Sequence, residues 1–458
     1  MKRRLSATTW GWVRTIGLTV LAWLLLLILA LVARPAVAQT APAAVTLKVF
    51  AGGSGQRPDL TRQLLAAYSK RHPHIQVEVE TGGASSDLQR QYLSTLLNAK
   101  DSSIDVYLID IVNPAQYHGA GWLQPLNALL GAPAQVLAPY LPAYTRANVV
   151  EGELVALPAF ADAMFLYYRR DLLDKHRQPL PRTWDELAAV ARAVQVAERG
   201  AAAGQGPGQG PEKRPDKNMA TLQGLSIQGA PIEGAVCTFL LPYWGQGLEI
   251  SDAQGKLTLD RAAATRGLQQ WLGMVEGGVI KKNVAEVRTS DTMTEFKAGQ
   301  VLFAVNWGFA WDRFQTDADS RVKGQVGVMA LPAVTRGQGA TCLGGWQWAV
   351  SAFSRHKSQA ADLVRYLAGV EAAKFYAMRG SLLPAHRALY EDTEVLQAVP
   401  WFRDAGAAVL AARSRPVSAD YAQNSDAIRS STSAALAGVK TPERATAEIG
   451  SRLARVMR

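Results

Sequence analysis

Hydrophobic and polar residues follow two alternating periods in the first part of the chain. A short apolar strand is predicted within residues 46–53, where it runs into Gly52 and Gly53. A half-buried strand with strict alternation is predicted at 74–80, and a nearly continuous apolar strand at 105–111. Between them, apolar residues recur at the spacing of one helix face, from Leu60 to Tyr68 and again from Leu88 to Lys100. This βαβαβ order predicts a parallel sheet with right-handed crossovers.

The ends of these predicted strands carry a glycine-rich turn and a carboxylate. Gly52, Gly53 and Gly55 follow the first strand, and Asp110 ends the third. Ligands of such sheets bind outside the carboxyl ends of the strands, so both features are candidates for a ligand site. The turn sequence GGSGQR matches neither G-x-x-x-x-G-K-[ST] nor G-x-G-x-x-G, and nucleotide binding has no support.

Residues 154–173, LVALPAFADAMFLYYRRDLL, form an apolar run interrupted by the carboxylate of Asp162. Pro158 cannot donate a ladder hydrogen bond, so the pattern predicts one strand into the interior followed by a second strand or a helix start. Asp162 is then expected where two elements meet. It either bonds locally at a turn or accepts hydrogen bonds from a ligand at the mouth of a cleft.

The remaining chain is predicted to be mainly helical. Thr183 and Glu186 form a capping box before an alanine-rich helix. Residues 199–217 are a Gly, Pro and Gln low-complexity segment, predicted to be a mobile surface loop. An amphipathic helix is expected from Ala360 to Ala377, and helix resumes from Ser425 onward.

Aromatic residues gather in short motifs in the second half. The motifs are LLPYWGQG with Tyr243 and Trp244, NWGFAW with Trp307, Phe309 and Trp311, and LGGWQWAV with Trp346 and Trp348. Aromatic side chains are usually core residues because they bury a large area. Most of these lie beside Gly, Asn or Gln, which is typical of loops that present flat rings to a ligand such as a sugar. Arg415 precedes Pro416, which disfavours helix and predicts an irregular segment there.

Composition narrows the class of protein. A chain of 458 residues with 48% hydrophobic and 19% charged residues predicts two or three folded domains rather than a disordered chain. The basic residues are scattered among acidic ones, which argues against nucleic-acid binding. The six histidines form no metal-binding motif, and no metal or cofactor is expected. Cys237 and Cys342 could pair in an oxidising compartment, but their spacing does not establish a disulfide.

The N-terminus resembles an export signal. Basic residues precede an apolar block at residues 16–33, and Ala36-Val37-Ala38 fits a signal peptidase site, so residues 1–38 are predicted to be a signal peptide. The block is also long enough to span a bilayer as an uncleaved anchor. Removing residues 1–38 deletes five basic residues and no acidic one, which lowers the net charge from +11 to +6.

The order of motifs along residues 45–458 resembles the extracellular solute-binding proteins of carbohydrate ABC transporters, and most nearly their trehalose/maltose-binding branch. The motifs are VFAGG, DVYLID, GWLQPL, LPAFADAMFLYYRRDLL, TWDEL, NWGFAW, VGVMALP, GGWQWAVS and RPV. The resemblance implies an α/β fold of the periplasmic-binding-protein type II class, with two hinged lobes and a ligand cleft between them. Lobe one is expected at residues 45–158 plus 345–381, and lobe two at 160–343 plus 384–458.

The resemblance and the aromatic motifs together predict the ligand-binding residues. They are Arg90, Asp110, Phe160, Asp162, Tyr243, Trp307, Phe309, Gly345, Trp346 and Arg415. Phe160 and Phe309 stand where the branch has tyrosine, and Arg57 stands where a glutamate is expected, with Asp59 as a candidate substitute.

The function implied is a non-enzymatic, monomeric periplasmic protein that delivers a di- or oligosaccharide to the permease subunits of an ABC importer. The alternative is a secreted glycoside hydrolase that uses Asp110 and Asp162 as acid and base. A hydrolase acid needs a raised pKa, whereas Arg90 and Arg415 in the same cleft are expected to keep the carboxylates ionised.

Deletion of residues 201–215 is expected to leave sugar affinity unchanged within about threefold, because a Gly, Pro and Gln loop makes few buried contacts. Calorimetry of the deletion variant beside the full-length protein measures this. Loss of folding or of binding would show that the segment packs on the cleft.

Overall fold

A computed structural model describes Trp23 and residues 43–83, 85–203, 222–252, 257–337 and 339–456. The predicted signal peptide, apart from Trp23, and residues 204–217 of the predicted loop lie outside the described residues. Within the described part of the chain, no helix is both long and apolar enough to cross a membrane.

The first three strands and the two helices between them form as the sequence predicts. Strand β1 (Val45–Phe50) pairs in parallel with β2 (Ile75–Glu80) and with β3 (Val106–Asp110). Helices α2 (Pro58–Arg71) and α3 (Ser86–Asn98) are the crossovers. The glycine turn and Asp110 therefore lie at the carboxyl ends of neighbouring strands, as expected.

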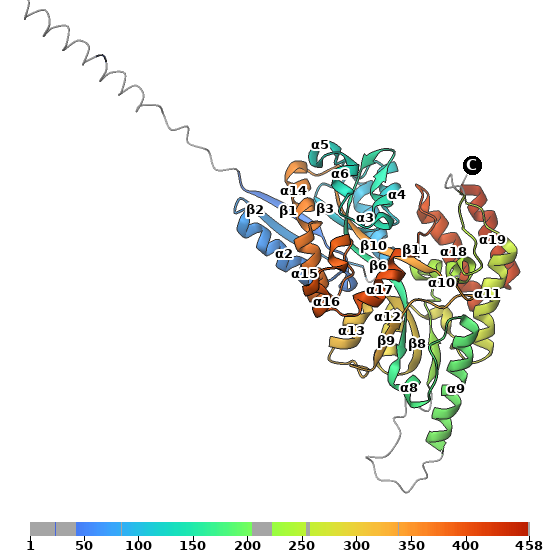
Figure 1. The fold of residues 1–458 in the computed structure, drawn as a ribbon. Coiled ribbons are helices and arrows are strands. Elements are labelled where there is room, and N and C mark those ends of the chain that lie inside the picture. The colour runs from blue at the N-terminus through green and yellow to red at the C-terminus, as the bar shows by residue number, and fades with distance from the viewer. Residues whose placement is uncertain are drawn as a thin grey trace, which may run out of the picture. The chain divides into compact units, whose positions relative to one another are not determined.

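Among the described residues, these strands belong to one nine-stranded sheet. Its order is β2-β1-β3-β10-β6-β8-β7, with β11 beside β10 and β9 beside β6. The later strands are β6 (Leu157–Arg169), β7 (Gln223–Ser226), β8 (Val301–Trp307), β9 (Val326–Met329), β10 (Thr341–Val350) and β11 (Ala412–Arg413). Strands β6 and β10 run between the group β1–β3 and the group β8–β9 (Figure 1).

Strand β6 corrects the prediction for the apolar run. It is one strand of 13 residues, so Asp162 lies inside a strand and not between two elements. Pro158 faces Gln347 where the register between β6 and β10 shifts, and this irregularity accommodates a residue without an N–H. The strand changes partner along its length, from β10 up to Ala163 to β8 from Met164 onward.

The helices follow the predicted order with two corrections. Residues 199–203, predicted to begin the surface loop, instead end the helix that starts at Trp184, because their alanines favour helix. Half of the predicted capping box forms at the start of α9 (Trp184–Ala203): the Thr183 hydroxyl accepts from the Glu186 N–H at 3.2 Å. The Glu186 carboxylate accepts from the Arg182 N–H at 2.7 Å instead of the Thr183 N–H. The helix expected from Ala360 to Ala377 is two helices, α14 (Lys357–Leu367) and α15 (Val370–Gly380), because the extended backbone of Gly369 separates them.

Four long helices pack on one another on the side of β7 and β8. They are α10 (Glu233–Trp244), α11 (Arg261–Glu276), α18 (Tyr421–Leu436) and α19 (Pro442–Val456). The shorter helices are α4 (Pro114–Gly119), α5 (Asn127–Leu130), α6 (Pro133–Leu137), α7 (Pro142–Thr145), α8 (Arg170–Lys175), α12 (Thr289–Lys297), α13 (Ala310–Thr316), α16 (Thr393–Ala398) and α17 (Phe402–Leu410). A separate hairpin pairs β4 (Val149–Val150) with β5 (Glu153–Leu154).

Helices α3 and α10 pack into different hydrophobic cores. The apolar side chains Leu93 and Leu97 of α3 are buried with Phe50 and Tyr107. Helices α10, α11, α18 and α19 share a second core with β7 and β8. A third and larger core surrounds β6 and β10. Contacts between α3 and α10 are therefore not made through a common apolar core.

The two cysteines, whose pairing the sequence left open, are bonded to each other. Cys237 of α10 and Cys342 of β10 form a disulfide, with their Cα atoms 5.7 Å apart. Both side chains are fully buried. The bond ties the four-helix group directly to a central strand.

Replacing both cysteines by alanine is expected to lower the free energy of unfolding by about 2 to 5 kcal/mol, because the bond restricts a long loop of the unfolded chain. Urea unfolding of the variant, beside wild-type protein with and without reductant, measures the change. The variant should match reduced wild type. Equal midpoints for the oxidised wild type and the variant would contradict the prediction.

Candidate ligand-binding cavity

A cavity opens beside the crossing of β6 and β10 and encloses about 830 Å³, including its mouth. Its wall combines the glycine turn after β1, the start of α3, the N-terminus of α10, and aromatic residues near the ends of β8 and β10. Seven of the ten predicted site residues line it: Asp110, Asp162, Trp307, Phe309, Gly345, Trp346 and Arg415.

The other three predicted residues lie elsewhere. Arg90 is buried behind the wall, where it pairs with Asp87 at 3.2 Å. The ring of Phe160 packs in the core, with its centroid 6.3 Å from that of Tyr376. Tyr243 is buried as well, and its hydroxyl accepts from the Asp260 N–H at 3.0 Å.

The position of Tyr243 on its helix explains its absence from the cavity wall. The cavity meets α10 at its N-terminus, and Tyr243 is near the opposite end of that helix. Ten residues of helix separate Tyr243 from Glu233, which is about 15 Å at 1.5 Å per residue. The Gly and Gln residues beside Tyr243 in LLPYWGQG therefore did not indicate a surface that lines the cavity.

Asp162 is both locally bonded and exposed to the cavity. Its Oδ1 accepts from the backbone N–H of Ala163 at 2.8 Å and of Gly308 at 2.7 Å. Only 6% of the residue is exposed. Burial raises the pKa of Asp162 to about 7, although the two N–H groups oppose the rise. The local bonds are present within a strand and not at a turn, and the residue also lines the cavity, so its role toward a ligand stays a prediction.

The expected electrostatic effect of Arg415 on Asp162 is corrected. The charge of Arg415 does favour ionised Asp162, but burial is the larger effect and the pKa of Asp162 rises. Arg415 makes its ion pairs with Asp110 and Glu233 instead, each at 2.9 Å. Its guanidinium also lies 5.9 Å from the ring centre of Trp307.

Glycines at two neighbouring positions of β10 leave space for the groups that pack beside them in and behind the cavity wall. Gly344 lies opposite Asp162, and a Cβ there would come within 2.6 Å of the Trp307 ring. Gly345 has φ +127°, and a Cβ would approach Phe160 O at 3.0 Å. A side chain at Gly344 would displace the half-buried ring of Trp307 from the cavity.

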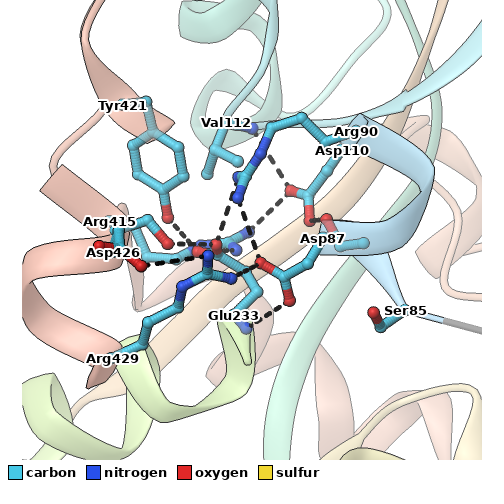
Figure 2. Close-up of polar contacts among 12 residues, drawn as sticks. Ser85, Asp87, Arg90, Asp110, Val112, Glu233, Arg415, Tyr421, Asp426 and Arg429 are labelled. Atoms are coloured by element: carbon cyan, nitrogen blue, oxygen red, sulfur yellow. Dashed lines mark hydrogen bonds and ion pairs between the residues drawn. The ribbon is translucent and has the colours of Figure 1, made fainter. Parts of the chain in front are cut away.

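Glu233, the first residue of α10, is a site residue that the sequence reading missed (Figure 2). Its carboxylate accepts from Arg415, from the Tyr421 hydroxyl and from the Ser425 hydroxyl at 2.7 Å. Burial alone would raise the pKa of Glu233, but the charges of Arg415 and Arg90 hold it below its usual value. The pKa of Arg415 is raised, because its acidic neighbours outweigh the cost of burial.

Asp87, in the first turn of α3, was also missed. Its carboxylate accepts from the Glu233 N–H at 2.8 Å and pairs with Arg90 and Arg429. The only sequence signal for Asp87 and Glu233 was an acid at a helix start. That pattern usually serves the helix itself.

Arg57, which replaces an expected glutamate, does not line the cavity. It pairs with Asp59 at 2.9 Å and with Asp312 at 2.8 Å. Asp59, the candidate substitute, is therefore occupied by Arg57 and does not line the cavity. Among the described residues, no group of three or more His, Cys, Asp or Glu is arranged to hold a metal ion.

Comparison with known proteins agrees with this architecture. Residues 53–374 match the family described as bacterial extracellular solute-binding protein. A relative from Deinococcus radiodurans, named "Probable ABC transporter-binding protein", is 33% identical over 423 residues, which covers 90% of this chain and 94% of the relative. The chain belongs to the bacterial extracellular solute-binding protein family.

Solved structures show the same fold. Maltose-bound MalE3 of T. maritima has a TM-score of 0.80 and 30% identity, and the match covers 90% of this chain and 100% of MalE3. A mannitol-bound solute-binding protein from Agrobacterium vitis has a TM-score of 0.73 and 20% identity, with coverage of 90% and 98%. The fold is the predicted two-lobe, type II periplasmic-binding fold.

The raised pKa of Asp162 predicts a pH-dependent difference between the wild type and Asp162→Asn. Between its usual value of 3.8 and about 7, the folded protein retains a proton that the unfolded chain releases, so wild-type stability falls as pH rises. Asparagine does not ionise and avoids this loss. From pH 5 to pH 8, the variant should gain about 2 to 3 kcal/mol relative to wild type.

Urea unfolding of both proteins at pH 5 and pH 8, without ligand, measures this difference. Any steric or hydrogen-bonding effect of the amide is the same at both pH values and cancels. A difference between the two proteins that does not change with pH would show that Asp162 has an ordinary pKa.

Proposed function

We propose that this chain is the non-enzymatic substrate-binding component of a carbohydrate ABC importer. It binds a di- or small oligosaccharide, a trehalose- or maltose-like α-glucoside, and delivers it to permease subunits in the membrane. It acts in the periplasm as a monomer after export by residues 1–38. Membership of an extracellular solute-binding family and likeness to a maltose-bound and a mannitol-bound protein support this assignment.

The observation that carries the proposal is the chemistry of the cavity wall. Trp307 and Trp346 line it together with the carboxylate of Asp162. Aromatic rings stack on the apolar faces of sugar rings, and a carboxylate accepts hydrogen bonds from sugar hydroxyls. A neutral, hydroxyl-rich ligand therefore fits this wall.

The other charged groups of the wall are already compensated. Asp110 pairs with Arg415 and accepts from the Ser86 hydroxyl at 2.7 Å, and Glu233 pairs with the same arginine. Within the described residues, Asp162 is bonded to backbone N–H groups and has no ion pair. Its second oxygen is the acceptor that we assign to a ligand hydroxyl.

We retain the proposed lobes, residues 45–158 plus 345–381 and residues 160–343 plus 384–458. The three crossings that this division needs are next to one another. Gly345 pairs with Ala161 across β10 and β6, and the Ala161 N–H donates to Leu383 O at 2.8 Å. Adjacent crossing segments are what a hinge requires.

The hydrolase alternative has one supporting observation, the raised pKa of Asp162, which suits a general acid. Its partner would be Asp110, which is bonded to Arg415 and Ser86. Both oxygens of a base in that position would already accept from protein donors while it activated water. Glucose released from α-linked disaccharides by the purified protein would favour the hydrolase.

Calorimetry against trehalose, maltose, sucrose, glucosylglycerol and mannitol tests the proposal. At least one α-glucoside should bind at micromolar concentration or tighter, and should be recovered intact. Trp307→Ala should weaken its binding by more than about 2 kcal/mol, on the scale of hot-spot residues.

Trp311→Ala is the matched control for this experiment. It removes a tryptophan from the same NWGFAW motif, but Trp311 stacks on Trp401 and does not line the cavity. Sugar affinity should stay within about threefold, because the Trp311 ring contributes no surface to the cavity wall. Equal losses in both variants, or no binding of any α-glucoside by wild type, would contradict the proposal.

A further inference from the structure

We propose that Asp87 is a positioning residue for ligand capture: its carboxylate caps helix α10 from helix α3 and so holds the two sides of the cavity together. The inference rests on the proposed function in that it treats the cavity as the site of capture. Its structural basis is independent of which ligand the cavity takes.

Helix α10 lacks a capping side chain of its own. The residue before it is Ile232, whose apolar side chain makes no cap hydrogen bond. The N–H of Glu233 donates to Asp87 Oδ2 at 2.8 Å instead. An acidic group at this position satisfies an otherwise unpaired N–H and interacts favourably with the positive end of the helix dipole.

Two ion pairs accompany the cap, and each side of the cavity contributes one acidic and one basic residue to them. Helix α3 contributes Asp87 and Arg90, and the other side contributes Glu233 and Arg429 (Figure 2). Asp87 pairs with Arg429, and Arg90 lies 3.6 Å from Glu233. The four side chains are only 6% to 19% exposed. Shielded pairs of this kind are costly to break one partner at a time.

These contacts join elements that share no hydrophobic core. The buried apolar residues of α3 belong to the core with Phe50 and Tyr107, and those of α10 belong to the core with β7 and β8. Helix α18 contributes to that second core and, through Tyr421, to the core around β6 and β10, but not to the core of α3. When the two sides separate, the cap and the charge pairs break together. These contacts therefore stabilise the joined state relative to the separated state.

Asp87 has little capacity left for a ligand although it lines the cavity. Its Oδ2 accepts from the Glu233 N–H, while Oδ1 accepts from Arg90 and Arg429. The expected role is to set the population of the joined state. A change in that population alters the apparent dissociation constant of every ligand by the same factor.

Asp87→Ala tests the inference, with Asp392→Ala as the matched control. Asp392 also caps a helix, accepting from the Val395 N–H at 3.0 Å, and also pairs with a cation, Lys374, at 2.8 Å. Both of its partners lie on α15 and α16, outside the cavity wall. Each variant loses a helix cap and its ion pairing, which is to Arg90 and Arg429 for Asp87 and to Lys374 for Asp392.

Small-angle X-ray scattering of the ligand-free proteins and sugar affinity are the readouts. Asp87→Ala should increase the radius of gyration, and should weaken all bound sugars by the same factor, about tenfold, through faster release. Asp392→Ala should change neither. Arg429→Gln, which breaks the same pair from the opposite side, should reproduce the effect of Asp87→Ala, and the double variant should lose less than the sum.

The outcomes separate this inference from the proposed function. If wild type binds no sugar but Asp87→Ala still increases the ligand-free radius of gyration, the proposed function fails and the role of Asp87 stands. An unchanged radius of gyration in both Asp87→Ala and Arg429→Gln overturns the inference. So does a loss of affinity that differs strongly among sugars, because that pattern identifies a direct ligand contact.

Discussion

The antiparallel pairing of β6 with β10 is the interaction on which the rest of the structure depends. It places Gly344 of β10 opposite Asp162 of β6. On its other edge β10 pairs with β3, where Trp346 lies opposite Asp110. The pairing of β6 with β10 also continues one sheet from β1–β3 to β8, so the carboxylates and rings of the cavity come from segments far apart in sequence. The disulfide from Cys342 of β10 then secures helix α10, whose N-terminus completes the wall.

Charge compensation decides what this cavity can recognise. Arg415 is 3% exposed and bonds to both Asp110 and Glu233, so three buried charges stabilise one another. Burying them without partners would be prohibitive. Asp162 has backbone N–H groups as its hydrogen-bond partners and no ion pair among the described residues, and burial shifts its pKa upward. The result is a wall in which a carboxylate without an ion pair lies beside aromatic surfaces, which suits hydroxyl groups better than anions.

The regular elements were predictable because their signals are local. The periods of residues 46–111 specify β1 to β3 and both crossovers, and the strand-end rule brings Asp110 to the cavity. The continuity of β6 was not predictable in this way. Pro158 is tolerated there because the partner strand shifts its register, a fact that belongs to β10 and not to the sequence around Pro158.

The residues of the cavity wall near the aromatic rings were predictable because they lie in sequence motifs of the family. Trp307, Trp346 and Arg415 lie in motifs of the family that the chain resembles, and they line the cavity. Tyr243 shared the same local composition but faces a core. Glu233 and Asp87 were missed because their significance comes from each other, 146 residues apart, and no local pattern reports such a pairing.

A crystal structure of the protein with its preferred α-glucoside tests the central claim most directly, namely that the cavity at the crossing of β6 and β10 holds a sugar. The account predicts an intact sugar with a ring against Trp307 or Trp346 and a hydroxyl within hydrogen-bonding distance of Asp162. A sugar bound at another surface, or a cleaved sugar beside Asp110 and Asp162, would contradict it.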